Sequence, residues 1–137
     1  MKAISIRQPW AWLIVNGVKN IENRSRRCHY RGPVLIHATK TVDWDAVEFL
    51  LTRFRHTPKA AVIGLLGSIC HESRNLGAIV GRAEIVDCVD HSESPWFTGP
   101  WGLVLRNPEI ITPIPWPGQQ SVPFNVPDRL LVEEKRP

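Results

Sequence analysis

Three ionisable side chains lie close together in the segment Gly17-Val18-Lys19-Asn20-Ile21-Glu22-Asn23-Arg24. If Ile21–Arg24 is extended, Glu22 and Arg24 point to one face, and a turn at Gly17 can bring Lys19 toward it. Arg24 offers a planar fork for a phosphate, Glu22 can accept from the exocyclic amine of a base, and a buried Lys19 can become a base. The spacing predicts a site for an anionic or amide-bearing ligand. The alternative is an ion-pair network that braces the turn without a ligand.

A basic tract runs from Arg24 to Arg31 and also contains Tyr30. Basic groups interleaved with an aromatic ring fit a phosphate track with a stacking platform. We therefore expect Arg26, Arg27 and Arg31 to follow the phosphates of a nucleic acid. The alternative is a solvated basic loop.

Further binding candidates come from two other places in the chain. Arg7 and Gln8 lie at a predicted strand-to-helix turn and could reach the same site, although Gln8 could equally cap the helix. Trp101 is expected to stack on a base, with a structural plug at one end of the fold as the alternative.

The remaining tryptophans divide by their position in the pattern. Trp10 and Trp44 lie on helical apolar stripes, and the spacing favours the core for both. Trp96 lies in a long loop with Phe97, where both rings are further stacking candidates.

The positive charge is concentrated at the N-terminal end. Of 137 residues with a formal net charge of +4, residues 1–31 hold seven Lys and Arg and one Glu, or +6. This asymmetry favours an anionic partner, chiefly nucleic acid.

The length fits one domain over residues 1–137. No apolar run reaches the roughly 18–20 residues of a membrane span, and no signal peptide is apparent, so we expect a soluble, cytoplasmic protein with no membrane partner. Three cysteines without a CxxC motif suit a reducing compartment. Neither a metal nor a cofactor is expected.

The elements that would position these residues are mostly short strands. A helix over Pro9–Asn16 should end in a left-handed cap at Gly17. A helical insert over 43–67 shows an apolar stripe of Trp44, Val47, Leu51 and Phe54, followed by a second short helix over Lys59–Leu66. The Pro-rich C-terminal part should form an edge strand or a wrapping loop. The predicted strands are Lys2–Arg7, Ile21–Arg24, Gly32–Ala38, Ala78–Val89 with a bend at Gly81, Trp101–Leu105, Ile110–Ile114 and Val122–Val126. Together they predict an α+β fold, a small β-barrel with two to three flanking helices.

The motif G-x-K-x-x-E-x-R, preceded by Arg7-Gln8-Pro9-Trp10 and followed by Gly32–Ala38, closely resembles the ASCH domain (activating-signal-cointegrator homology). ASCH domains are a branch of the PUA-like β-barrel superfamily. The resemblance covers Ile4–Ala38 and resumes at Val80–Val89 and Trp101–Asn107. It implies a barrel with a cleft beside the first helix, lined by the motif, that binds RNA or modified bases.

The resemblance implies more than one activity. Some small ASCH proteins are amidohydrolases that deacylate N4-acetylcytidine, and others are reported as ribonucleases. The amidohydrolases look similar at Gly17, Lys19 and Arg24 but carry threonine where this chain has Glu22. The longer cointegrator-type ASCH domains are more similar, so we favour binding of RNA, single-stranded DNA or a modified nucleoside. If the chain is a metal-independent hydrolase, Lys19 is the expected base and Glu22 the proton carrier. A protein-interaction adaptor is the third hypothesis, and the sequence names no protein partner.

Overall fold

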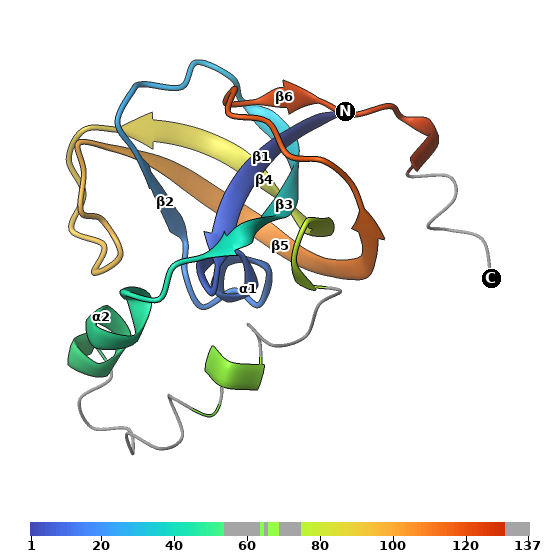
Figure 1. The fold of residues 1–137 in the computed structure, drawn as a ribbon. Coiled ribbons are helices and arrows are strands. Elements are labelled where there is room, and N and C mark those ends of the chain that lie inside the picture. Colours follow the sequence, from blue (N-terminus) through green and yellow to red (C-terminus); the bar gives the residue numbers. More distant parts are fainter. Residues whose placement is uncertain (54–63, 65, 69–74, 131–137) are drawn as a thin grey trace.

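The structure, a computed structural model, describes residues 1–53, 64, 66–68 and 75–130 (Figure 1). Its helices α1 and α2 span Trp10–Val15 and Ala46–Arg53. One mixed sheet contains six strands: β1 (Lys2–Gln8), β2 (Ile21–Arg24), β3 (Gly32–Val42), β4 (Ala78–Val89), β5 (Trp101–Pro115) and β6 (Phe124–Asn125). The predicted α+β class is confirmed.

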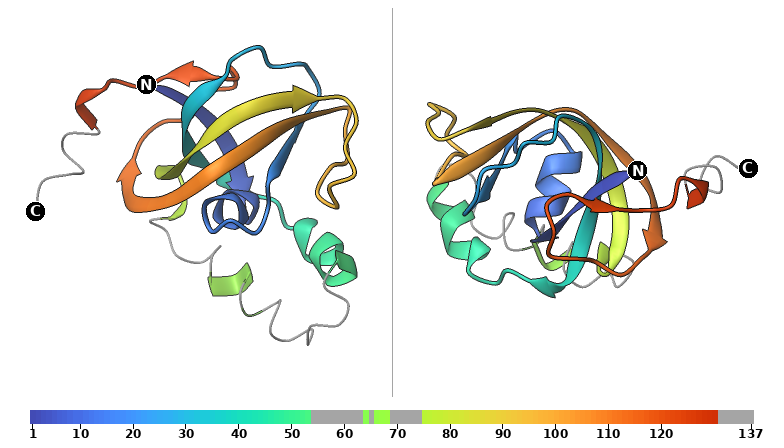
Figure 2. Two further views of the ribbon diagram at one scale, coloured as in Figure 1. Left: turned by 180° about the vertical axis from the view of Figure 1, so that it is seen from behind. Right: turned by 90° about the horizontal axis from the view of Figure 1, so that it is seen from above.

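The strand order in the sheet is β2-β5-β4-β3-β1-β6. β1 and β3 pair in parallel, and the other four pairings are antiparallel. The parallel pair requires a crossover, and α1 and β2 both lie on that connection. The sheet curves around α1, which is seen within the curve when the molecule is viewed from above (Figure 2).

The expected closure into a PUA-like barrel was wrong. β2 and β6 are the two terminal strands of the order, and they have no pairing with each other in the described part of the chain. β6 is only two residues long and pairs with Lys2 and Ala3 at the start of β1. A strand this short cannot present a ladder to a further strand, so the sheet stays open.

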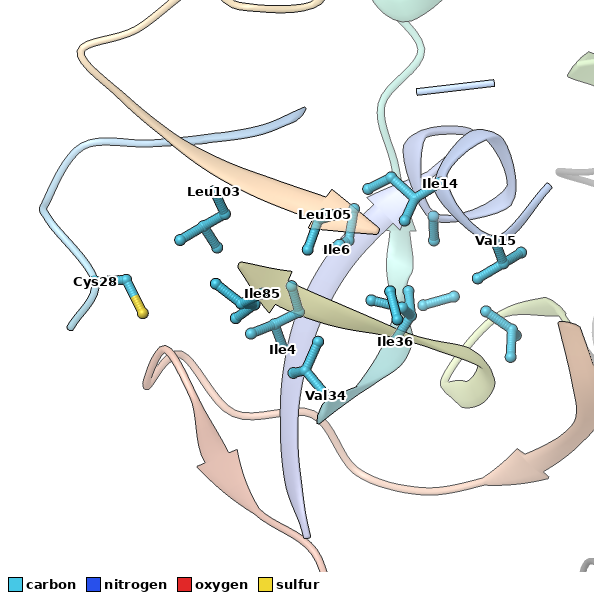
Figure 3. Close-up of a cluster of buried hydrophobic side chains, with 14 of the residues drawn as sticks. Ile4, Ile6, Ile14, Val15, Cys28, Val34, Ile36, Ile85, Leu103 and Leu105 are labelled. Atoms are coloured by element: carbon cyan, nitrogen blue, oxygen red, sulfur yellow. The ribbon is translucent and has the colours of Figure 1, made fainter. Parts of the chain in front are cut away.

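The main core lies between α1 and the concave side of the sheet. Ile14 and Val15 from α1 meet Ile4, Ile36 and Ile85 from three strands (Figure 3). Gly81 permits this contact, because a Cβ atom there would lie 2.3 Å from Cγ1 of Val15. The predicted bend at Gly81 is confirmed, because the strand register shifts beside it on both edges of β4, in the pairing with β3 and in the pairing with β5.

Of two C-terminal expectations, one changed and one was confirmed. The segments predicted as separate strands before and after Pro108 form one strand, β5. Its prolines are tolerated because β2 pairs only with Trp101–Val104, so the rest of β5 pairs with β4 alone among the described residues. The last predicted strand is confirmed as the short edge strand β6.

The expected apolar stripe of α2 is met only in part. Leu51 is half-buried and packs against a second apolar cluster beside α1. Among the described side chains of α2, Ala46 and Leu50 are buried, whereas Trp44, just before the helix, is 59% exposed, so its predicted place in the stripe was wrong. Ala46 and Leu50 join Leu13, Ile21 and Trp96 in this second cluster. Most of the helix expected over Lys59–Leu66, together with Phe54, lies outside the described residues.

No helix in the described ranges is long and apolar enough to cross a membrane.

Candidate nucleic-acid interface

A cleft of about 620 Å³ opens beside α1 and β2. Lys19, Glu22 and Arg24 form one side, and Trp10, Phe49 and Trp96 contribute aromatic rings. Further lining comes from β1, from β2 and the residue after it, from the segment before α2 with the first residue of that helix, and from the loop after β4: Ser5, Ile6, Arg7, Asn23, Ser25, Asp43, Asp45, Ala46 and Thr98. Four of the predicted site residues therefore line one cavity: Arg7, Lys19, Glu22 and Arg24.

The end of α1 places Lys19. Gly17 has a φ of 76° and forms the expected left-handed cap, with its N–H donating to the carbonyl of Ile14. The N–H groups of Val18 and Lys19 both donate to the carbonyl of Leu13. The chain then enters β2, where Glu22 and Arg24 fall on the same face by strand alternation.

These three side chains form a paired cluster, hereafter the ionic cluster. Nζ of Lys19 lies 3.2 Å from Oε1 of Glu22, and Nη2 of Arg24 lies 3.1 Å from Oε2. Nζ of Lys19 also donates to the carbonyl of Ile21, and Nη2 of Arg24 donates to the carbonyl of Ser5 at 2.6 Å. One carboxylate therefore joins two cations, as the bracing alternative requires, and the cluster also lines the cleft.

Burial differs among members of the ionic cluster. The side chains of Lys19, Glu22 and Arg24 are 5%, 12% and 25% exposed. Burial lowers the pKa of the Lys19 ammonium from its ordinary value of 10.5; Glu22 opposes this shift, and Arg24 lowers the pKa further. Lys19 is therefore the most buried member of the ionic cluster, and Arg24 is the most exposed.

The aromatic rings of the cleft are held by one another and by Asp43. Nε1 of Trp10 donates to Oδ2 of Asp43 at 2.8 Å. Phe49 meets Trp10 edge-on, with ring centroids 5.5 Å apart and planes at 79°, and its centroid lies 6.3 Å from that of Trp96. Nζ of Lys19 lies 5.6 Å from the Trp10 ring centroid. The cleft thus offers aromatic surface beside charged hydrogen-bonding groups.

Asp43, Phe49 and Asn23 are site residues that the sequence analysis missed. Asp43 begins the predicted helical insert but was given no role in binding, and Phe49 lies outside the predicted apolar stripe of its helix. Asn23 follows Glu22 on the opposite face of β2. The motif on β2 carries no signal for Asp43 and Phe49, because tertiary packing brings them to the cleft from another segment. Asn23 was missed because strand alternation places it opposite the charged side chains.

The charges around the cleft balance. Arg7, Lys19 and Arg24 face the acids Glu22, Asp43 and Asp45. Arg7 is half-exposed, and its Nη2 lies 3.4 Å from Oδ2 of Asp43. A cleft with three cations and three anions suits a neutral polar group, such as a nucleobase, better than a phosphate.

The basic tract lines a separate cavity of about 550 Å³, hereafter the basic cavity. Arg26 and Arg27 contribute to it, and Gln120 and Ser121 approach from the C-terminal part. Arg24 lines both the basic cavity and the cleft, so it connects the two.

Gln8, Arg31 and Trp101 do not line the cleft. Gln8 is buried, and its Oε1 accepts from the N–H of Trp12, which is the capping alternative. Arg31 donates to the carbonyls of Cys28 and Tyr30. Trp101 packs on the core, with Cζ of Arg27 lying 5.5 Å from its ring centroid.

Comparison with known proteins gives a consistent result. A model of the ASCH domain matches residues 4–102. Human activating signal cointegrator 1 is 27% identical over 132 residues, which cover 87% of this chain and 21% of that protein. The chain thus spans about a fifth of the length of this curated relative.

Solved structures support the fold. Crystal structures of two mutant proteins of ZmASCH from Zymomonas mobilis match with TM-scores of 0.56 and 0.50, each at 18% identity. Both matches cover 96% of this chain, and they cover 96% and 94% of those chains.

Proposed function

The chain belongs to the ASCH domain family, and on this basis we propose that it binds RNA or another single-stranded nucleic acid. The family is associated with RNA binding. In the proposed complex, one nucleobase enters the cleft and the adjoining phosphates follow Arg24 into the basic cavity. The observation that carries this proposal is that Arg24 lines two cavities at once. One is the cleft, where the charges balance, and the other is the basic cavity, which is rich in arginine.

The contents of the cleft support its role as the base pocket. Phe49 is 37% exposed and offers ring surface to a base, while Asp43 and Glu22 are acceptors for an exocyclic amine. Stacking of a base on an aromatic side chain contributes about 1–3 kcal/mol. An unstacked base of a single strand can enter such a cleft, whereas a base within a duplex cannot.

The basic cavity supports the role of phosphate site. Arg26 and Arg27 are exposed, and neither belongs to an ion pair that we find in the described residues. When exposed arginines bind the phosphates of a nucleic acid, the counterions condensed on those phosphates are released. Binding should therefore weaken steeply as salt is added.

Fluorescence polarisation with a labelled 12-nucleotide RNA tests the proposal, with the DNA of the same sequence and the RNA duplex as comparison ligands. Phe49→Ala tests the cleft, and Arg26→Ala with Arg27→Ala tests the basic cavity. Arg82→Ala is the matched control, because Arg82 lies on β4 and pairs with Glu109. We expect the first two variants to lose at least fivefold in affinity and the control to bind like the wild type. Equal affinity in all three variants would contradict the proposal.

A hydrolase of N4-acylated cytidine is the second candidate, favoured by the buried Lys19 beside Glu22. Neutral Lys19 would take a proton from the water that attacks the acyl carbon. Glu22 would then carry that proton from Lys19 to the N4 atom as the bond between N4 and the acyl carbon breaks. Incubation with N4-acetylcytidine, followed by chromatography, tests this chemistry. Release of cytidine by the wild type and its loss in Lys19→Ala would support it, and no release would exclude this substrate.

Labelled RNA incubated with EDTA tests for metal-independent ribonuclease activity in the same preparation.

A further inference from the structure

A serine and a histidine are hydrogen-bonded to each other on neighbouring strands, outside the ionic cluster. Ser5 on β1 and His37 on β3 are direct partners in the parallel pairing. Oγ of Ser5 lies 3.0 Å from Nδ1 of His37, and Nε2 of His37 lies 2.7 Å from the carbonyl oxygen of Trp116. The Ser5 hydroxyl, the His37 imidazole and the Trp116 carbonyl therefore form one continuous chain of hydrogen bonds.

The tautomer of His37 follows from its partners. A carbonyl oxygen can only accept, so Nε2 carries the proton and donates it to Trp116. In neutral imidazole Nδ1 then has a free lone pair, and the Ser5 hydroxyl donates to it. His37 is 2% exposed, and burial lowers the pKa of its ring although the Trp116 carbonyl opposes the shift. The neutral form, which can accept a proton from serine, is therefore favoured at pH 7.

Ser5 is accessible from two cavities. It lines the cleft and also a cavity of about 550 Å³, hereafter the histidine cavity, which His37, Arg24 and Lys40 line as well. Gly118 lies directly over the pair, because a Cβ atom there would come within 2.7 Å of Oγ of Ser5 and 2.6 Å of Cε1 of His37. A side chain at position 118 would collide with the pair, so only glycine lets the segment after β5 approach Ser5 and His37 this closely beside the histidine cavity.

Arg24 also has an uncommitted donor in this region. Its Nε atom is buried and has no hydrogen-bond partner among the described residues. Its Nη2 holds the carbonyl of Ser5, so the guanidinium is fixed close to the residue that carries the hydroxyl. A hydrogen-bond donor fixed beside a nucleophile can stabilise a developing oxyanion.

We propose that Ser5 is a nucleophile activated by His37, and that the pair hydrolyses small carboxylic esters that carry a negative charge. Oγ of Ser5 bonds to the ester carbonyl carbon while its proton passes to Nδ1 of His37. The alcohol leaves with that proton, which gives an acyl-serine. A water molecule then attacks the acyl carbon while its proton passes to Nδ1 of His37. The bond between the acyl carbon and Oγ breaks, Oγ takes that proton from His37, and the free acid leaves. Arg24 and Lys40 provide the positive charge that selects an anionic ester. This activity does not depend on RNA binding.

Covalent labelling tests the nucleophile. The full chain is incubated with a fluorophosphonate, and adducts are located by intact mass and peptide mapping. We expect one adduct per chain, on Ser5, lost in Ser5→Ala and slowed at least tenfold in His37→Gln. Ser92→Ala is the control, since the Ser92 hydroxyl accepts a backbone N–H from Ser94. No adduct on Ser5, or labelling at the wild-type rate in folded His37→Gln, would overturn the proposal.

Two further variants cover the case in which His37→Gln does not fold. Gly118→Ala keeps both residues of the pair but places a methyl group over them, so labelling should slow at least tenfold in protein with a native circular dichroism spectrum. Lys40→Met tests selectivity with mono-4-nitrophenyl succinate and neutral 4-nitrophenyl acetate. We expect its preference for the anionic ester to fall about fivefold. Turnover of both esters that persists in Ser5→Ala at the wild-type rate would contradict the assignment of Ser5.

Discussion

Asn23 Nδ2 donates to the carbonyl of Trp96 at 3.0 Å, which ties the strand of the ionic cluster to the loop that supplies an aromatic ring of the cleft. The same amide accepts through Oδ1 from the N–H groups of Thr98, at 2.8 Å, and Gly99, at 3.2 Å. One side chain thus fixes three positions of the loop, and the width of the cleft depends on it.

Asn23→Ala removes these three hydrogen bonds. We expect the free energy of unfolding to fall by about 1–2 kcal/mol and the loop to open, with a several-fold loss of RNA affinity. Amide hydrogen exchange at residues 96–99 measures the opening. Asn16→Ala is the control, because it removes one exposed hydrogen bond to Trp12. Unchanged exchange in Asn23→Ala would show that other contacts hold the loop.

Glu22→Gln leaves Lys19 and Arg24 without the charge that joins them. Removing one partner of a buried ion pair costs about 3 kcal/mol, because the other charge stays uncompensated. Chemical denaturation measures the change. The matched control is Glu109→Gln, which breaks the more exposed pair with Arg82 and should cost at most about 1 kcal/mol. Equal losses in the two variants would indicate that the ionic cluster is solvated.

Stability should depend on pH through Lys19. Its pKa is lower in the folded protein than the ordinary value of 10.5, chiefly through burial. Between these two values the unfolded chain holds a proton that the folded chain has lost, so the free energy of unfolding rises with pH. Denaturation of the wild type and Lys19→Met at several pH values measures this effect. The difference, wild type minus variant, should increase up to pH 10.5, and a decrease would mean that Glu22 outweighs burial.

Arg26 and Arg27 should determine the salt dependence of RNA binding. Each phosphate contact to a single strand contributes about −0.7 to the slope of log affinity against log salt concentration. Replacing both arginines with alanine should make the slope shallower by about 1.4 if each contacts one phosphate. Titrations at four salt concentrations measure the slope. A slope equal to that of the wild type would place the phosphates elsewhere.

Local patterns predicted the part of the site that lies on one segment. The left-handed cap at Gly17 and the alternation in β2 act within a few residues, and together they place Lys19, Glu22 and Arg24. These side chains come into contact because of the local backbone conformation, and a segment of about eight residues is enough to determine that conformation. Their role in binding stays a prediction.

Features that depend on packing between segments were harder to predict. Around α2 the sequence offers more than one set of apolar residues, and it does not show that the small Ala46 is buried whereas Trp44 is largely exposed. Barrel closure depends on whether the terminal strands β2 and β6 pair, which no local pattern reports. The same reason explains why Phe49 and Asp43 were missed at the cleft.

The long strand β5 has a consequence for how molecules of this protein meet. Beyond Leu105 one side of β5 has no neighbouring strand in the described part of the chain, yet Pro108, Pro113 and Pro115 occur there. A proline has no amide hydrogen, so wherever its nitrogen faces the open edge it cannot donate to an incoming strand from a second molecule. The domain therefore carries built-in protection against intermolecular β-sheet growth, even though its sheet is open.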